Sequence, residues 1–245
     1  MRALGLIIAL LTLSLSELRA LDYQYHKVET GSLWGKSELR LLFFRSNEHQ
    51  LKVVDNGSMT KPKFVDLGAA VNSLGGIAGC NGGFFAKEGY PLGQVVEKGK
   101  AIGGVAENSA LVSGVYLLSD SGPQLMRSGL YAKHRKKLSG LSDALQTGPF
   151  LVENSKVIKG LSGENRRNRT FIMEDGKGNW AIGTCQAVSL ARLGEILSQP
   201  HLISGFTTRT ALNLDGGTSS ALFVQGSWKV RNAKPVRNYL VLTKA

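Results

Sequence analysis

The segment Asn213-Leu214-Asp215-Gly216-Gly217-Thr218-Ser219-Ser220 places one carboxylate, two adjacent glycines and three hydroxyl side chains directly after an apolar stretch. The alternation of apolar residues up to Leu214 predicts a strand that presents Asn213 and Asp215 on one side. A carboxylate beside a loop rich in N–H and O–H donors is typical of a site with a proton acceptor or a nucleophile. Asp-Gly is also a common turn dipeptide, so a simple hairpin turn is the structural alternative.

A second glycine-rich segment, Cys80-Asn81-Gly82-Gly83-Phe84-Phe85, follows an expected strand over residues 76–80. The adjacent glycines Gly82 and Gly83 allow main-chain N–H groups to converge on an anion or a sugar hydroxyl. Asn81 can donate and accept hydrogen bonds at once, and the Phe84 ring offers an apolar face to a sugar. The alternative is a turn capped by core phenylalanines.

Two further segments add polar side chains. The basic run Glu164-Asn165-Arg166-Arg167-Asn168-Arg169-Thr170 leads into an expected strand. An exposed basic run is usually a solvated face, but Arg169, nearest the strand, is the one best held for bidentate contact with a phosphate. The segment Gln146-Thr147-Gly148-Pro149 places an amide beside another glycine turn.

The pattern along the chain predicts an α+β fold in a single domain, mostly antiparallel sheet with a few short helices. Hairpin turns are expected at residues 153–156 and 175–179. Helices are expected at residues 66–74 and 190–197, the second with Ser189 as its N-cap. The expected strands are residues 39–45, 111–119, 170–174, 180–184, 221–224 and 239–242.

The first twenty residues are expected to lie outside this domain. Arg2 is followed by an apolar run over residues 3–15, which is short for a membrane span and typical of a secretory signal peptide. We expect cleavage near Ala20, a catalytic domain over residues 21–245, and export to the periplasm or the medium. In that compartment Cys80 and Cys185 could form a disulfide, which the sequence leaves open.

Several apparent motifs carry little weight. Residues 31–37 are one residue short of a phosphate loop, and residues 176–181 join strand to strand rather than strand to helix. Residues 217–221 lack the last glycine of a nucleophile elbow, although a serine hydrolase using His134 or His201 stays an alternative. The four histidines have no metal-binding spacing.

Five segments in this order resemble the phosphodiester glycosidase family: residues 81–85, 146–149, 168–170, 213–220 and Lys234-Pro235-Val236-Arg237-Asn238. The resemblance runs from about Leu39 to the C-terminus. It implies an α+β domain that hydrolyses a sugar-1-phosphodiester at the glycosidic carbon. Two departures, Thr218 in place of a third glycine and the bulky residues 171–173 after Arg-Thr, bear on the identity of the sugar.

The resemblance also assigns site residues. It implies Asp215, Arg169 and Asn81 as catalytic residues. The expected substrate-binding residues are Gly82, Gly83, Phe84, Gln146, Gly148, Gly216, Gly217, Thr218, Ser219 and Asn238.

In the expected chemistry two protein groups act on different ends of the substrate. Hydrolysis builds positive charge on the sugar and negative charge on the leaving phosphate. Arg169 and the loop N–H groups would bind the phosphate, and Asp215 would act as base or nucleophile. The sequence predicts no cofactor and leaves a divalent metal open. It does not select a second carboxylate from Glu88, Glu97, Glu107, Asp143 and Glu164.

The net charge of +12 favours polyanionic partners such as phosphorylated carbohydrates. Loss of residues 1–20 removes Arg2, Glu17 and Arg19 and leaves about +11. Nucleic acid is a rival partner, suggested by the basic run at residues 133–137, but no nucleic-acid module is recognisable. A non-catalytic binder of anionic glycans is the third interpretation. The sequence leaves the sugar, the anomer and the oligomeric state open.

Overall fold

The structure is a computed structural model that describes residues 21–32, 35–200 and 202–245. The expected signal peptide at residues 1–20 and His201 lie outside the described residues. Among the described residues no helix is long and apolar enough to cross a membrane.

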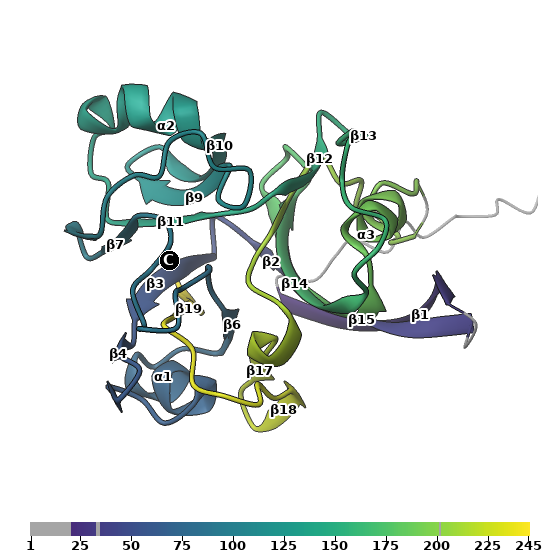
Figure 1. The fold of residues 1–245 in the computed structure, drawn as a ribbon, viewed down its shortest axis with the longest axis horizontal. Helices are drawn as coiled ribbons and strands as arrows, with labels where there is room; N and C mark the ends of the chain where they lie inside the picture. The colour runs from purple at the N-terminus through teal and green to yellow at the C-terminus, as the bar shows by residue number, and fades with distance from the viewer. Residues whose placement is uncertain (1–20, 33–34, 201) are drawn as a thin grey trace, which may run out of the picture.

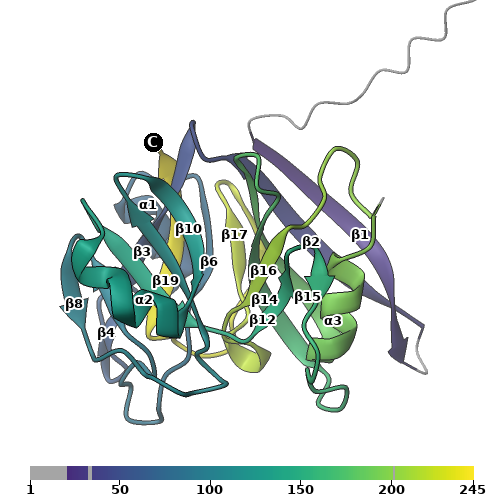
Figure 2. The same ribbon diagram turned by 90° about the horizontal axis from the view of Figure 1, so that it is seen from above.

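Three antiparallel sheets build most of the fold, as expected (Figures 1 and 2). The largest has the strand order β1-β2-β15-β14-β16-β12-β13. Its strands are β1 (Leu21–Ser32), β2 (Gly35–Arg45), β15 (Asn179–Val188), β14 (Arg167–Glu174), β16 (Thr210–Asn213), β12 (Phe150–Glu153) and β13 (Lys156–Val157).

Two five-stranded sheets form the other half of the molecule, on the left in Figure 1. One has the order β10 (Gly122–Arg127), β9 (Gly114–Ser119), β11 (Asp143–Thr147), β7 (Val95–Glu97) and β8 (Lys100–Ile102). The other has the order β18 (Ser227–Val230), β17 (Leu222–Val224), β6 (Ala78–Asn81), β19 (Asn238–Lys244) and β3 (His49–Asp55). A short pair, β4 (Gly57–Ser58) and β5 (Lys61–Pro62), follows β3.

The three sheets share one core. Buried residues from each sheet, including Leu42, Val53 and Leu145, belong to the same hydrophobic cluster. The run 41–44 in β2 is continuously apolar, and all four side chains are buried. Leu42 and Phe44 face this shared core, whereas Leu41 and Phe43 face a second cluster on the other side of the sheet. A strand buried on both faces needs apolar side chains at successive positions.

The helices are short and cover the outer faces. Helix α3 (Leu190–Leu197) begins and ends as expected, and its N-cap Ser189 accepts a hydrogen bond from the backbone N of Arg192. Helix α1 (Leu67–Ser73) is capped by Asp66. Helix α2 (Ser128–His134) and the 3₁₀ turn η1 (Arg135–Lys137) were not expected from the periodicity, because only Ser128 and Tyr131 of α2 are buried and no apolar stripe marks the helix.

Both predicted hairpins are confirmed. Asn154 and Ser155 have φ values of 51° and 58°, so the turn between β12 and β13 is left-handed at both central positions. The turn between β14 and β15 uses Gly176 and Gly178, with φ values of 76° and 89°.

Several strand boundaries differ from the prediction; for example, the strands expected over 39–45, 170–174, 180–184 and 239–242 are all longer in the structure. The strand expected over residues 111–119 starts at Gly114, because residues 111 and 112 form a turn. The strand expected over 76–80 is β6, Ala78–Asn81, and the one expected over 221–224 begins at Leu222. β16 ends at Asn213, so the alternation expected to carry Asn213 and Asp215 to one side does not extend to Asp215.

Both cysteines are buried and free. Burial raises the pKa of Cys185 to about 12 and raises the pKa of Cys80 as well. Because both thiols are free, the structure contains no disulfide between Cys80 and Cys185.

Candidate active site

The loop that carries Asp215 lies between β16 and the 3₁₀ turn η2 (Gly217–Ser219). Two backbone hydrogen bonds attach it to other segments. The N–H of Leu214 donates to the carbonyl of Thr170 at 2.8 Å, and the N–H of Asp215 donates to the carbonyl of Gly82 at 3.0 Å. The predicted site segments at residues 81–85, 168–170 and 213–220 are therefore in direct contact.

Asn81 lies at the centre of these contacts and is fully buried. Its Nδ2 donates to the carbonyl of Asp215 at 2.7 Å and, at 3.4 Å, to that of Gly82. Its Oδ1 accepts from the Thr170 hydroxyl at 2.7 Å and from the N–H of Ala221 at 2.9 Å. With its hydrogen-bonding groups used in this way, Asn81 holds the Asp215 loop in place.

The Asp215 side chain is half-buried. Its Oδ1 accepts a hydrogen bond from the N–H of Gly216 at 2.8 Å. Burial raises the pKa of Asp215 above its usual value, while hydrogen bonds from Ser219 and from the Gly216 N–H oppose that rise. A carboxyl group with a raised pKa is suited to proton transfer closer to neutral pH than a solvated aspartate.

Arg169 extends from β14 beside this loop. Its Nε donates to the carbonyl of Val188 at 3.2 Å, and its Nη2 donates to the carbonyl of Asn165 at 2.7 Å. Burial, followed by the nearby charge of Arg167, lowers the pKa of Arg169. An arginine guanidinium remains charged under ordinary conditions, so the side chain supplies a fixed, half-buried cation.

Gly216, the residue that follows Asp215, packs against Arg169. A Cβ placed on Gly216 would lie 2.6 Å from the carbonyl oxygen of Asn168 and 3.7 Å from both Cα and Cδ of Arg169. Only a residue without a side chain therefore permits this approach. Two of the three predicted catalytic residues, Arg169 and Asp215, therefore lie on neighbouring segments.

The paired glycines of the first segment lie against Asn238 and the end of β11. The N–H of Gly83 donates to Oδ1 of Asn238 at 2.7 Å. A Cβ on Gly82 would lie 2.1 Å from the same oxygen, and one on Gly83 would lie 3.1 Å from the carbonyl oxygen of Gln146. Asn238 therefore positions the glycine loop, and that loop requires glycine at residue 82.

Gln146 is buried and organises a neighbouring loop. Its Oε1 accepts from the N–H groups of Gln94 and Ala106 at 3.1 and 2.9 Å. Its Nε2 donates to the carbonyls of Ala106 and Val112 at 2.6 and 3.0 Å. The amide expected to bind substrate is thus used to hold the segment over residues 94–112.

The remaining predicted residues occupy different environments around Asp215. The carbonyl of Gly148 accepts from Nδ2 of Asn213 at 2.8 Å. Ser219 is buried and Thr218 is exposed. Gly217 has a φ of 64° with open space around its Cβ position, so its conformation, rather than crowding, favours glycine. Phe84 is half-buried.

The second carboxylate left open by the sequence is not selected by these contacts. Asp143 is buried and accepts from the N–H of Val53 at 2.9 Å, and Lys52 lies 3.6 Å from it. Glu97 pairs with Lys63 at 3.5 Å. Within the described ranges no cluster of three or more histidine, cysteine, aspartate and glutamate side chains is arranged to hold a metal ion.

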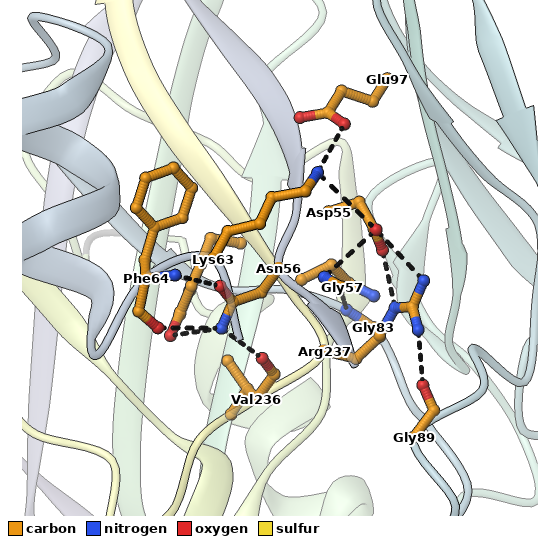
Figure 3. A network of polar contacts seen from close by, with 12 residues as sticks. Asp55, Asn56, Gly57, Lys63, Phe64, Gly83, Gly89, Glu97, Val236 and Arg237 are labelled. Atoms are coloured by element: carbon orange, nitrogen blue, oxygen red, sulfur yellow. Dashed lines mark hydrogen bonds and ion pairs between the residues drawn. The ribbon is translucent and has the colours of Figure 1, made fainter. Parts of the chain in front are cut away.

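A buried ion pair beside the site was not predicted from the sequence (Figure 3). Arg237 binds Asp55 with two hydrogen bonds, from Nε to Oδ1 at 2.7 Å and from Nη2 to Oδ2 at 3.1 Å. Its Nη1 donates to the carbonyl of Gly89 at 2.8 Å. Arg237 stands in the fifth segment of the resemblance, next to Asn238, and that position was the available signal. Its partner is 182 residues away in sequence and carries no motif.

Comparison with known proteins identifies a family and a fold. The sequence model described as phosphodiester glycosidase matches residues 75–243. The fold is similar to the catalytic domain of zebrafish N-acetylglucosamine-1-phosphodiester alpha-N-acetylglucosaminidase, auto-inhibited by its pro-peptide. The two share 13% identity with a TM-score of 0.71, over 94% of this chain and 85% of that one.

A hypothetical protein from Synechocystis has 16% identity and a TM-score of 0.59, with 91% of this chain and 62% of that one covered. Both likenesses concern the fold. Comparison with curated proteins finds no match.

Proposed function

This chain belongs to the phosphodiester glycosidase family, and from that membership we propose that it hydrolyses the bond between the anomeric carbon of a sugar and an oxygen of a phosphodiester. The observation that carries the proposal is the packing of Arg169 against Gly216, the residue that follows Asp215. A fixed cation and a half-buried carboxyl group on neighbouring segments suit a substrate with an anionic end and a carbohydrate end.

In the proposed reaction Arg169 binds the phosphate. Its Nε and Nη2 are held by backbone carbonyls, and the Nη1 group, which neither bond uses, is the donor that we assign to the phosphate. Rigid placement matters because a donor that is already oriented stabilises developing charge without reorganisation.

In the same scheme Asp215 acts at the sugar end of the substrate. As the C–O bond breaks, the electron pair leaves with the phosphate monoester, and the anomeric carbon gains positive charge. Asp215 then accepts a proton from the attacking water, or bonds to the anomeric carbon before water displaces it. A phosphate monoester leaves readily, so this scheme does not require a strong general acid.

We extend the proposal to export and to the substrate class. The apolar run in residues 3–15 supports export. Mass spectrometry of the protein isolated from expressing cells tests this, because it shows whether the chain has been cleaved near Ala20. The net positive charge supports phosphate-bearing glycans as substrates. The zebrafish relative is named for N-acetylglucosamine-1-phosphodiester, so diesters of that sugar phosphate are the first probes.

The test is the product formed from the methyl diester of N-acetylglucosamine 1-phosphate. A glycosidase releases free N-acetylglucosamine and methyl phosphate, whereas a phosphodiesterase releases the sugar 1-phosphate. We expect free sugar, and a loss of at least about 10²–10³-fold in rate for Asp215→Asn. Binding without release of sugar would favour a non-catalytic binder of anionic glycans. Full activity of Asp215→Asn would remove Asp215 from the mechanism.

Two more measurements distinguish the glycosidase from a serine hydrolase and from a nucleic-acid-binding protein. Activity that is lost in Ser219→Ala but kept in Asp215→Asn would indicate a serine hydrolase. Tight, salt-sensitive retention on DNA with no release of sugar would indicate a nucleic-acid-binding protein.

A further inference from the structure

A cavity of about 970 Å³ lies between the C-terminal end of α1, strand β3, the turn that joins β7 to β8, and the start of β11. Its volume is in the range of small-molecule binding sites, about 300–1,000 Å³. It is lined by none of the residues predicted to catalyse the reaction or to bind its substrate. The cavity therefore shares no predicted residue with the candidate active site.

One wall of the cavity is apolar. It is formed by Val54 on β3, by Phe64, which precedes α1, and by Leu74, which follows it. Val54 is buried, and Phe64 and Leu74 are partly buried against the same hydrophobic cluster. An apolar group placed in the cavity would remove more of this carbon surface from water, which favours binding of a ligand with an apolar part.

The other wall is charged, and two of its three lysines have carboxylate partners. Lys52 is the first, with its Nζ 3.6 Å from Oδ2 of Asp143. The buried Asp143 carboxylate also accepts hydrogen bonds from the N–H of Val53 at 2.9 Å and from the Ser142 hydroxyl at 2.8 Å. These contacts occupy both oxygens of Asp143 within the fold, so this carboxylate is not available to a ligand.

Lys63 is the second paired lysine (Figure 3). Its Nζ lies 3.5 Å from Glu97 and 4.0 Å from Asp55. Arg237 binds Asp55 with two hydrogen bonds and neutralises it, so Lys63 and Glu97 balance each other's charge. Two lysines and two carboxylates of the charged wall therefore cancel.

Lys98 is the third lysine, and its charge is left over, because it forms no ion pair within the part of the chain that the structure describes. It stands with Gly99 in the turn between β7 and β8, where the two residues have φ values of 50° and 76°. The N–H of Gly99 donates to the carbonyl of Ser142 at 2.7 Å and holds the turn in place. Such turns favour asparagine or glycine at both positions. A lysine in a left-handed conformation is costly for the turn alone, and this points to a role for its ammonium group.

We propose that this cavity binds an amphipathic anion, a molecule with an apolar body and one carboxylate or phosphate group. The apolar body packs against the wall of Val54, Phe64 and Leu74, and the anionic group pairs with Lys98. The surplus of one positive charge favours an anionic head group over a neutral or cationic one. This binding site does not depend on the proposed glycosidase activity.

The first test is calorimetric titration of the protein with four ligands that share a ten-carbon chain, each below its micelle concentration. They are decanoate, decyl phosphate, decanol and decyltrimethylammonium. We expect at least one of the two anions to bind, and to bind more tightly than decanol and decyltrimethylammonium. Binding of only one anion identifies the anionic group as carboxylate or phosphate. Equal or tighter binding of the alcohol or the ammonium compound would overturn the proposal, and so would no binding of either anion.

Substitutions then place the anion in the cavity. Lys98→Gln should raise Kd roughly fivefold, which is the size of one partly screened charge contact. Lys159→Gln is the matched control, because Lys159 is exposed and does not line the cavity. Ser73 is exposed and lines the cavity, so Ser73→Glu should weaken anion binding and Ser73→Arg should strengthen it. Both substitutions add a long side chain, and their opposite effects would separate charge from obstruction.

Chemical-shift mapping by NMR locates the bound anion independently of these variants. Shifts of the backbone amides at residues 73–74, 97–98 and 142–143 support the proposal, and shifts confined to other residues overturn it. A Kd that is the same in Lys98→Gln, Ser73→Glu and wild-type protein also overturns it. So does binding that is lost only in Arg169→Gln, because the anion would then occupy the candidate active site.

Discussion

The side-chain amide of Asn81 donates a 2.7 Å hydrogen bond to the backbone carbonyl of Asp215, 134 residues further along the chain. The oxygen of the same amide holds Thr170, next to Arg169, and the N–H of Ala221. One buried side chain thus holds the backbone of Asp215 directly and that of Arg169 through its neighbour Thr170. The asparagine of the first glycine-rich segment acts on the backbone of the site, and this explains why an amide, rather than an acid or a hydroxyl, suits position 81.

Replacement of Asn81 by alanine should lower both the stability and the activity of the protein. The Asp215 carbonyl, the Ala221 N–H and the Thr170 hydroxyl would each lose a buried partner. We expect the free energy of unfolding to fall by about 3 kcal/mol. Urea unfolding measures it, with Asn47→Ala as the control because Asn47 is exposed. A stability equal to that of wild-type protein would show that these bonds are replaced by others.

The sequence predicted those strands and helices whose formation depends on residues close together in the chain. The run 39–45 indicated a strand by composition alone, and Ser189 indicated the start of α3 by its ability to cap. The glycine-rich segments were found because glycine marks unusual backbone. The contact of Gly216 with Arg169 could only be implied by resemblance, since it depends on the pairing of β14 with β16.

The roles of individual side chains were harder to predict. Gln146 and Asn81 were expected to face the substrate, and the structure uses their amides to hold backbone groups. An amide has the same composition in either role, and only burial separates them. The ion pair of Arg237 was not predicted because its partner Asp55, at the end of β3, is 182 residues away in sequence.

The raised pKa of Asp215 predicts a specific dependence of stability on pH. Between the usual pKa of 3.8 and the raised value, the folded carboxyl keeps its proton while the unfolded one loses it. The folded state then binds more protons, so the free energy of unfolding falls as pH rises through this window. Asp215→Asn lacks this titrating carboxyl group. The free energy of unfolding of Asp215→Asn minus that of wild-type protein should therefore increase with pH through this window and then level off.

Urea unfolding of both proteins from about pH 4 to about pH 8 measures this difference. Glu107→Gln is the surface control for the loss of one carboxylate, because Glu107 is exposed. Parallel curves for wild-type protein and Asp215→Asn would contradict a raised pKa. If Asp215 acts as the base, the acid limb of kcat/KM should also have its midpoint above 3.8.

Gly82→Ala tests the close approach of the glycine loop to Asn238. The new Cβ would lie 2.1 Å from Oδ1 of Asn238, so one of the two must move and the bond to the Gly83 N–H is lost. We expect a loss of about 3 kcal/mol in stability and a strong fall in activity. Gly104→Ala is the control, since nothing lies within 4 Å of its Cβ position.

A second substitution distinguishes this clash from a general intolerance of alanine. Asn238→Ala removes the oxygen that the new Cβ meets. It should therefore cost less stability in the Gly82→Ala background than in wild-type protein, and a double-mutant cycle measures that coupling. Strictly additive costs would mean that the two residues are not in contact in solution.

The ion pair between Arg237 and Asp55 offers the last prediction, because the chain contains an exposed pair of the same geometry. Arg127 binds Glu153 with bonds of 3.0 and 2.8 Å, and these side chains are 42% and 33% exposed. Those of Arg237 and Asp55 are 13% and 6% exposed. Water screens the exposed pair, so its coupling free energy should be below about 1 kcal/mol.

The buried pair should couple by about 2 kcal/mol and should respond weakly to salt. Double-mutant cycles with Arg237→Gln and Asp55→Asn, and with Arg127→Gln and Glu153→Gln, compare the two pairs by urea unfolding. Arg237→Lys keeps the charge but cannot form both bonds to Asp55 and the bond to Gly89. It should therefore keep only part of the coupling free energy with Asp55. Equal coupling in the two pairs would mean that burial does not strengthen the contact.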